Sequence, residues 1–302
     1  MLLRRMLLPL TCTALIALPA VLWPARGGTV RTAPGWTAQA AARFWTPERM
    51  TAAMPAPGRS LPPVDQAAAE TPASEAPDSA AYIAGVPAVG VLFSVGDDMA
   101  AHYCTASVVH SPGRDLVLTA AHCDPGTDVG FVPQYRAGVG ADRQPYGIWA
   151  VAEVFTDPRW APDDDAASDH DVAFARVRRN RHGQRLEDVT GANRLAPTPG
   201  YRNRVTVIGY PRLGGDPTDR AVACTTTTGR LDRRDQLRLF CDGFSGGTSG
   251  SPWLLGYDSR TGTGTVIGLI GGLGGGGPTD RVSYSPLFSD AVLALYRRAT
   301  GG

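Results

Sequence analysis

From Tyr82 onward, the chain is a succession of short β-prone runs separated by turn residues, and this pattern constrains the fold more than any other feature. About nine such runs are evident, interrupted by Gly, Pro and Asp. They include VPAVGVLFSV, DLVLTAAHC, GIWAVAEVF, DVAFARV, RVTVIGYP, LRLFCDGF and TVIGLIGG. Because helical segments do not alternate with these runs, the pattern favours an all-β barrel or sandwich over βα units.

The last residues have a different pattern, which predicts a C-terminal helix over about 289–299. Ser289 or Asp290 can cap the first turn, and Gly301 follows the basic end. Val292 and Leu295 fall on one face of this helix. The length of 302 residues permits one large or two ordinary domains.

The first 80 residues have few β-prone runs. Residues 1–25 place two arginines before a short apolar run, which predicts a signal peptide; a single-span anchor is the alternative, and the export route stays open. Residues 26–80 are rich in Ala and Pro and predict a largely disordered pro-segment or linker. Within it, FWTPERMTAAM is expected to form a short amphipathic element docked on the rest, although a simple spacer is the alternative. The folded domain is therefore expected over 81–302.

Four cysteines remain after the predicted signal peptide: Cys104, Cys123, Cys224 and Cys241. An even number in an exported chain predicts two disulfides. Three pairings are possible, and Cys104–Cys123 with Cys224–Cys241 is favoured because each would join neighbouring strands. No Cys-x-x-Cys or clustered His/Cys spacing indicates zinc, so we expect no metal and no cofactor. The net charge of +1 gives no reason to expect nucleic acid as a partner.

The stretch GGTSGSPW, at 246–253, is either one more turn or the site of a nucleophile, Ser249. A serine hydroxyl keeps its proton near neutrality and needs a base, usually histidine. His122 ends the run LVLTAAHC, where a strand stops and a cysteine follows, and is the candidate base. The other histidines are expected in surface or loop positions: His102, His110, His170 and His182.

Asp171 begins the run DVAFARV and is the candidate partner for the Nδ1–H of His122. The acidic residues before it, Asp163–Asp165 and Asp169, are expected to form a hydrated loop, and calcium binding there stays open. Around the candidate nucleophile, the glycines leave backbone amides accessible. Those of Gly247 and Ser249 are the candidate oxyanion donors.

A second motif, GFSGG at 243–247, matches the Gly-x-Ser-x-Gly nucleophile elbow with Ser245 at its centre. That arrangement requires a helix directly afterwards and a later histidine. Pro252 disfavours the helix, and no histidine follows His182. We therefore expect Ser245 to be a turn residue.

Taken together, LTAAHC, DVAF and GTSGSP, in this order, resemble the chymotrypsin-like (trypsin-like) serine peptidases over about residues 82–298. GTSGSP and GYP (209–211) resemble the bacterial secreted, glutamyl-endopeptidase-like branch more closely than the animal digestive enzymes. FWTPERMTAAM resembles the pro-segment of secreted actinobacterial trypsin-like peptidases, which are zymogens. The resemblance implies two packed six-stranded antiparallel β-barrels, over about 82–185 and 200–288, with the site in the cleft between them. It also implies the roles of nucleophile, base and orienting carboxylate for Ser249, His122 and Asp171.

The sequence departs from the family pattern at two places. Thr248 replaces the Asp that pairs with a freed amino terminus in the digestive enzymes, so this activation switch is expected to be absent. At the specificity pocket, to which Gly243 and Phe244 are assigned, no Asp stands six residues before the nucleophile, and VIGLIGG has no histidine. Neither a strict basic nor a strict acidic preference is predicted. Gly271 and Gly272 are expected to form an open pocket wall and an edge for pairing the substrate backbone.

The resulting hypothesis is a secreted serine endopeptidase that acts on protein or peptide substrates. It is expected to be a monomer without stable membrane association after signal removal. A catalytically silent relative that binds protein in the same cleft is one alternative. An esterase acting through the same three residues is another.

Overall fold

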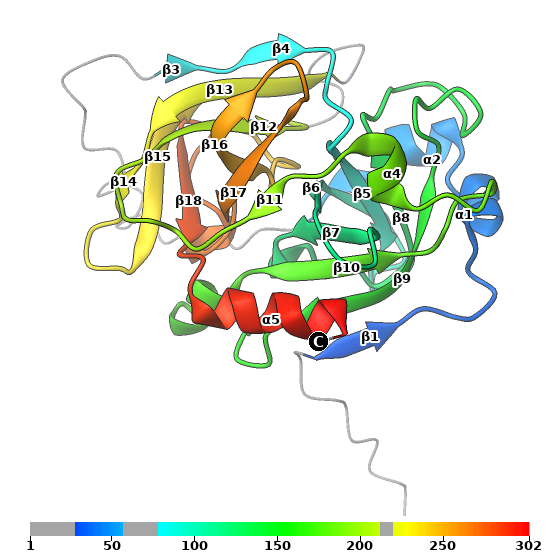
Figure 1. Ribbon diagram of the computed structural model, residues 1–302, viewed down its shortest axis with the longest axis horizontal. Helices are drawn as coiled ribbons and strands as arrows, with labels where there is room; N and C mark the ends of the chain where they lie inside the picture. Colours follow the sequence, from blue (N-terminus) through cyan, green and yellow to red (C-terminus); the bar gives the residue numbers. More distant parts are fainter. Residues whose placement is uncertain (1–27, 57–77, 163, 212–219, 302) are drawn as a thin grey trace, which may run out of the picture.

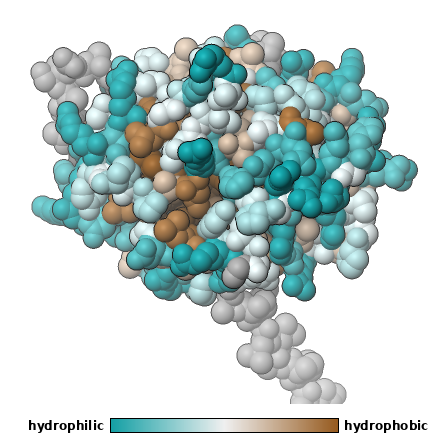
Figure 2. Space-filling model, in the orientation of Figure 1, coloured by the Kyte–Doolittle hydropathy of each residue, from teal (hydrophilic) through white to brown (hydrophobic). Residues whose placement is uncertain are grey.

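The computed structural model describes residues 28–56, 78–162, 164–211 and 220–301, and these form two β-barrels packed side by side (Figure 1). Residues 1–25, where the sequence predicts a signal peptide, lie outside the described residues. Within the described parts, no helix is long and apolar enough to span a membrane. The surface facing the viewer is mainly hydrophilic, with apolar residues gathered near its centre (Figure 2).

The first barrel is closed by six antiparallel strands in the order β9-β10-β7-β6-β5-β8, with β8 paired to β9. The strands are β5 (Val89–Val95), β6 (Ala101–Val109), β7 (Leu116–Thr119), β8 (Thr127–Pro133), β9 (Trp149–Thr156) and β10 (Ala173–Val177). Neighbouring residues along a strand enter different apolar clusters: Leu92 packs with Trp149, whereas Phe93 packs with Trp45. Both faces are therefore buried, which explains why these runs are almost continuously apolar.

The second barrel is built from two sheets. Strands β12 (Arg204–Gly209), β13 (Ala221–Thr227), β16 (Pro252–Asp258) and β17 (Thr263–Leu269) form one, extended by β4 (Ala81–Ile83) and β11 (Arg194–Leu195). The other contains β15 (Gln236–Asp242) and β18 (Val282–Pro286), with β14 (Gly229–Arg230) and β3 (Asp78–Ser79) at its edges. β13 contacts β15, and β17 contacts β18, so six strands surround the apolar core. The predicted pair of six-stranded barrels is confirmed.

The C-terminal helix α5 (Asp290–Thr300) follows the second barrel but packs across β9 and β10 of the first (Figure 1). Ser289 Oγ accepts from the Ala291 amide at its start, and Gly301 ends it in the left-handed conformation. Val292 and Leu295 are buried against the first barrel. The helix therefore ties the end of the second barrel to the outside of the first. The connection between barrels holds the short helix α4 (Leu186–Thr190).

Residues 28–56 pack on the first barrel, which differs from the largely disordered segment expected over 26–80. β1 (Thr29–Arg31) extends the sheet at β9, and β2 (Met54–Pro55) pairs with β6. Between them, α1 (Ala38–Phe44) and α2 (Pro47–Ala52) bring Trp36, Trp45 and Met50 into the core. The composition of 26–80 is dominated by Ala and Pro, so it does not indicate that a few large apolar side chains are buried. Residues 57–77 lie outside the described residues.

Both predicted disulfides are present. Cys104–Cys123 joins β6 to the 3₁₀ turn η1 (Ala121–Cys123), and Cys224–Cys241 joins β13 to β15. The second bridge therefore links the two sheets of the second barrel where no strand ladder joins them among the described residues.

We expect reduction of Cys104–Cys123 to lower the free energy of unfolding by about 3 kcal/mol, because the bridge closes a short loop in the unfolded chain. The measurement compares the denaturant unfolding of the Cys104→Ser/Cys123→Ser variant with that of the parent protein. A free-thiol assay of the parent establishes that its disulfides are formed. An unchanged midpoint in the double variant would contradict this prediction.

Candidate active site

His122 lies in the turn η1, directly after β7, where the apolar strand ends. Its neighbour Cys123 is bonded to Cys104 of β6, so the turn is fixed at two points on adjacent strands. The side chain of His122 is only 9% exposed. A histidine held in this way loses little further conformational freedom when it acts.

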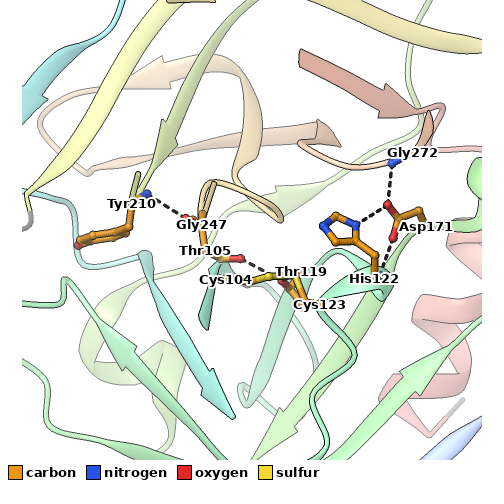
Figure 3. The surroundings of a disulfide bond; sticks show 9 residues. All are labelled: Cys104, Thr105, Thr119, His122, Cys123, Asp171, Tyr210, Gly247 and Gly272. Carbon is orange, nitrogen blue, oxygen red and sulfur yellow. Dashed lines mark hydrogen bonds and ion pairs between the residues drawn. A yellow bond between two sulfur atoms is a disulfide. The ribbon is translucent and has the colours of Figure 1, made fainter. Parts of the chain in front are cut away.

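Asp171 follows the 3₁₀ turn η2 (Ala166–His170) and lies two residues before β10 begins at Ala173. Its Oδ2 lies 2.7 Å from His122 Nδ1 and accepts a second hydrogen bond, of 2.7 Å, from the Gly272 amide. Its Oδ1 accepts from the backbone amide of His122 at 2.8 Å (Figure 3). The carboxyl side chain is 2% exposed, and three N–H groups converge on its two oxygens. Because a carboxylate is an acceptor only, this arrangement places the proton of a neutral His122 on Nδ1.

Gly271 and Gly272 pass Asp171 at close range. A Cβ on Gly271 would lie 3.0 Å from Asp171 Oδ2, and one on Gly272 would lie 2.5 Å from Gln236 Oε1. Gly272 also has φ of +89°, a conformation that favours glycine. The Gly271 amide donates to Tyr284 O and the Gly272 amide to Asp171. These two amides therefore support the site from within, a role that the sequence did not predict.

Gln236 was not identified from the sequence, yet it connects both barrels beneath the site. It is fully buried at the start of β15. Its Nε2 donates to Ser168 Oγ and Asp169 Oδ1 of η2, and its Oε1 accepts from the Leu273 amide. It thereby holds the turn before Asp171 to the segment after Gly272. No sequence signal marks a single glutamine in a strand for this position.

The loop that carries Ser249 is bonded to β6 of the first barrel. The Thr105 amide donates to both Gly247 O and Ser249 O, each at 2.9 Å, and Thr105 Oγ1 donates to Gly247 O at 3.0 Å. Gly250 packs so closely that a Cβ there would lie 2.2 Å from Thr105 O. Thr105 is the neighbour of Cys104, and the disulfide joins Cys104 to Cys123, the neighbour of His122 (Figure 3). The serine loop and the histidine are therefore both attached to the same part of β6.

Ser249 itself is half-buried in this loop. No hydrogen bond joins Ser249 Oγ to His122 Nε2, and Nε2 has no partner among the described residues. Such bonds are often longer in free enzymes and shorten when substrate binds.

The candidate oxyanion donors lie in the same loop. Gly247 has φ of +97°, and a Cβ there would lie 2.4 Å from the Tyr103 ring, so glycine is required. Within the described parts of the chain, neither the Gly247 amide nor the Ser249 amide donates a hydrogen bond. Both are therefore available to a developing negative charge.

Thr248 and Ser245 lie beside the candidate nucleophile, and the sequence predicts no catalytic role for either. Thr248 is buried, and its hydroxyl donates to Ser245 O at 2.7 Å, so it forms a local turn contact where the digestive enzymes place an ion pair. A strand, β16, follows Ser245 and Ser249 where the nucleophile-elbow interpretation needs a helix. The all-β fold excludes that interpretation, and Ser245 lies in a turn.

Gly243 and Phe244 lie at the turn after β15. Both of their amides donate to Asp280 O, and Gly243 has φ of +106°. The Phe244 side chain is 5% exposed and belongs to the core of the second barrel, so it packs inward. Burial and the nearby carboxylate of Asp242 raise the pKa of Asp280.

The remaining histidines have other neighbours. His102 pairs with Asp98, His110 with Glu187 and His170 with Asp157, while His182 accepts from Arg181 in an exposed turn. The one grouping of metal-ligating residue types among the described residues is Cys104, His122 and Cys123. Its two sulfurs are joined to each other, so they are not free thiolate ligands.

Two six-stranded β-barrels, a hydrogen-bonded His–Asp pair on the first of them, and a serine-bearing glycine loop bonded to β6 are typical of the chymotrypsin-like serine peptidases. A family model described as a trypsin-like peptidase domain matches residues 104–269. The chain belongs to this family and is a serine endopeptidase by class.

Solved structures give the same result for the fold. The protease Anisep from Arthrobacter nicotinovorans superposes with a TM-score of 0.62 at 24% identity, covering 73% of this chain and 99% of that one. A thermostable serine protease, AL20, from an extremophilic microorganism gives a TM-score of 0.60 at 25% identity, covering 72% and 99%. A Glu endopeptidase gives 0.50 at 16% identity, covering 74% and 98%. A comparison with curated proteins found no match.

Proposed function

We propose that this chain hydrolyses peptide bonds through Ser249, His122 and Asp171, with an acyl-enzyme intermediate. The observation that supports this most directly is the buried His122, which is bonded to Asp171 through Nδ1 and has no partner at Nε2 among the described residues. An imidazole in this state offers a lone pair at Nε2 and is therefore a base.

In the proposed reaction, Ser249 Oγ attacks the scissile carbonyl while His122 Nε2 takes its proton. Asp171 stabilises the imidazolium that forms, and the amides of Gly247 and Ser249 stabilise the oxyanion. His122 then gives the proton to the leaving amine as the C–N bond breaks. Water, deprotonated by the same nitrogen, cleaves the acyl-enzyme ester and restores the serine hydroxyl.

We also propose that the protein is exported and acts outside the cell as a monomer. Residues 1–25 would be the signal peptide, 26–80 a pro-segment with its linker, and 81–302 the peptidase domain. The paired cysteines support this, since disulfides persist in oxidising compartments. No strict preference for an acidic or a basic residue at the attacked carbonyl is proposed.

A fluorescent organophosphonate probe tests the proposed nucleophile. We expect it to label the parent protein covalently and to leave Ser249→Ala unlabelled. Ser245→Ala is the matched control, because Ser245 is four residues away in the same loop and should leave labelling intact. Labelling of Ser249→Ala, or its loss in Ser245→Ala, would overturn the assignment.

Turnover separates the alternatives. The endopeptidase should cleave internally quenched peptides as well as small esters, and both activities should disappear in Ser249→Ala. Cleavage of esters alone would indicate an esterase. Binding of protein without any turnover or labelling would indicate a silent relative.

A further inference from the structure

The end of the upstream segment 28–56 lies beside the loop that carries the candidate nucleophile. β2 (Met54–Pro55) pairs in parallel with β6, with Pro55 opposite Tyr103, and the Ala56 amide donates to Tyr103 O at 2.9 Å. Ala53 and Ala56, on either side of β2, are buried in the core of the first barrel. The position of Pro55 is therefore fixed by a backbone pairing and by burial at both ends of β2.

Pro55 and Tyr103 cover two consecutive glycines of the serine loop. A Cβ on Gly246 would lie 3.3 Å from Pro55 Cβ and 3.4 Å from its Cγ, so the proline ring lies against this glycine. A Cβ on Gly247 would lie 2.4 Å from the ring of Tyr103, which is buried. The Tyr103 hydroxyl donates to Pro211 O at 3.1 Å, which fixes the ring in turn. The two rings thus pack against the two residues that the Gly246–Gly247 peptide bond joins.

This peptide group carries the Gly247 N–H, one of the two proposed oxyanion donors. Within the described residues, neither the Gly247 amide nor the Gly246 carbonyl makes a hydrogen bond to another backbone group. Glycine on both sides gives the peptide group more freedom to rotate than larger residues would. The next carbonyl, Gly247 O, is held by Thr105, but the N–H is not. Packing against Pro55 and Tyr103 is therefore what holds the direction of this N–H.

The direction of the peptide group decides whether it assists the reaction. If it turned over, the Gly246 carbonyl oxygen would take the place of the N–H. A carbonyl oxygen repels a developing negative charge, whereas an N–H stabilises it, and loss of one such donor typically lowers kcat by about 10²–10³-fold. Because the oxyanion exists only after attack, contacts that fix the N–H affect kcat more than substrate binding.

We propose that Pro55 is a positioning residue for catalysis, through which the upstream segment 28–56 supports the active site. Together with Tyr103, it holds the Gly246–Gly247 peptide group with its N–H toward the oxyanion. The proposal rests on the proposed peptidase function. It gives the segment an activating role, so that an enzyme without the Pro55 contact would be a weaker catalyst.

Substitutions at Pro55 test this role in the full chain. Pro55→Gly removes the ring, and we expect kcat on a quenched peptide to fall about tenfold with KM nearly unchanged. Pro55→Val restores a side chain of similar bulk and should recover most of the loss. Met54→Ala is the matched control, because this neighbour in β2 is 51% exposed and should keep the parent kcat. Thermal unfolding establishes that each variant is folded.

A second measurement separates positioning from a general structural role. When a peptide trifluoromethyl ketone binds, Ser249 Oγ adds to its carbonyl carbon, the hydroxyl proton passes to His122, and the carbonyl oxygen becomes the oxyanion. The corresponding peptide alcohol cannot be attacked and reports binding without an oxyanion. We expect Pro55→Gly to weaken inhibition by the ketone about tenfold and to leave the affinity for the alcohol unchanged.

The outcomes distinguish this proposal from the proposed function. If the parent shows no Ser249-dependent turnover, the proposed function itself is wrong. If turnover depends on Ser249 but Pro55→Gly retains the parent kcat and ketone affinity, the peptidase assignment stands and the positioning role is overturned. An equal loss of affinity for ketone and alcohol would also overturn it. So would a rise in kcat, which would mean that the segment obstructs the site.

Discussion

Replacing Asp171 by asparagine is expected to lower kcat about 10⁴-fold without unfolding the protein. The reason lies in the three N–H groups that converge on the carboxylate. If the amide NH₂ takes the place of Oδ2, it faces His122 Nδ1, which must then be the acceptor. The imidazole proton moves to Nε2, and the nitrogen that should accept the Ser249 proton can no longer do so.

If the asparagine amide is rotated by half a turn, the site is disrupted in another way. Its NH₂ would then face the backbone amide of His122, which now donates to Asp171 Oδ1 at 2.8 Å. The imidazolium formed during attack would also lack its negative partner. The measurement is kcat on a quenched peptide for Asp171→Asn, with thermal unfolding to establish that the variant is folded.

The matched control for this prediction is Asp188→Asn, which removes a carboxylate that pairs with Arg114 on the surface. It should retain the parent kcat. A loss of less than about tenfold in Asp171→Asn would contradict the assigned role, because one lost neutral contact already accounts for a change of that size.

The sequence predicts His122, Asp171 and Ser249 because each lies in a short local motif at the end or start of a strand. The β-prone runs likewise predict the barrels, since strand patterning is a local property. The disulfide pairing followed from the proximity of cysteines on neighbouring runs. Each of these inferences depends on residues that lie close together in the chain.

The contacts that position the site could not be predicted in the same way. The Gly272 amide reaches Asp171 across 101 residues, and Gln236 reaches Ser168 across 68. Neither residue type is distinctive in its segment. The sequence predicts a pocket wall at Gly272, and Gly272 does line a pocket beside His122, but nothing in the sequence indicates that its amide also holds the Asp171 carboxylate. Such roles arise only when the two barrels meet.

The sequence anticipates the N-terminal segment only in part: FWTPERMTAAM is expected to dock on the rest, as α2 and its neighbours do, whereas most of 26–80 is expected to be disordered. Its Ala- and Pro-rich composition predicts a largely disordered segment over 26–80, but the packing of residues 28–56 depends on a few large side chains. The indole N–H groups of Trp36 and Trp45 donate to Val129 O and Asp128 O of β8. Both indoles thus combine apolar burial with a satisfied polar atom.

Replacing Trp45 by alanine is expected to lower the free energy of unfolding by about 3–5 kcal/mol. Trp45 is fully buried, its ring lies 5.3 Å from that of Phe93, and its indole fills the space above Gly130, where a Cβ would lie 2.7 Å from Cδ1. Alanine would leave a cavity and remove the indole donor from the Asp128 carbonyl. Segment 28–56 is thus part of the folded unit, and the loss should appear in the unfolding of the whole first barrel.

Denaturant unfolding of the full chain measures this, on a Ser249→Ala background so that self-cleavage does not interfere. Met54→Ala is the matched control, because Met54 belongs to the same segment and is 51% exposed; its effect should stay within about 0.5 kcal/mol. Equal midpoints for Trp45→Ala and Met54→Ala would mean that residues 28–56 cover the barrel without stabilising it. A large difference would mean that the packing of residues 28–56 contributes to the stability of the first barrel.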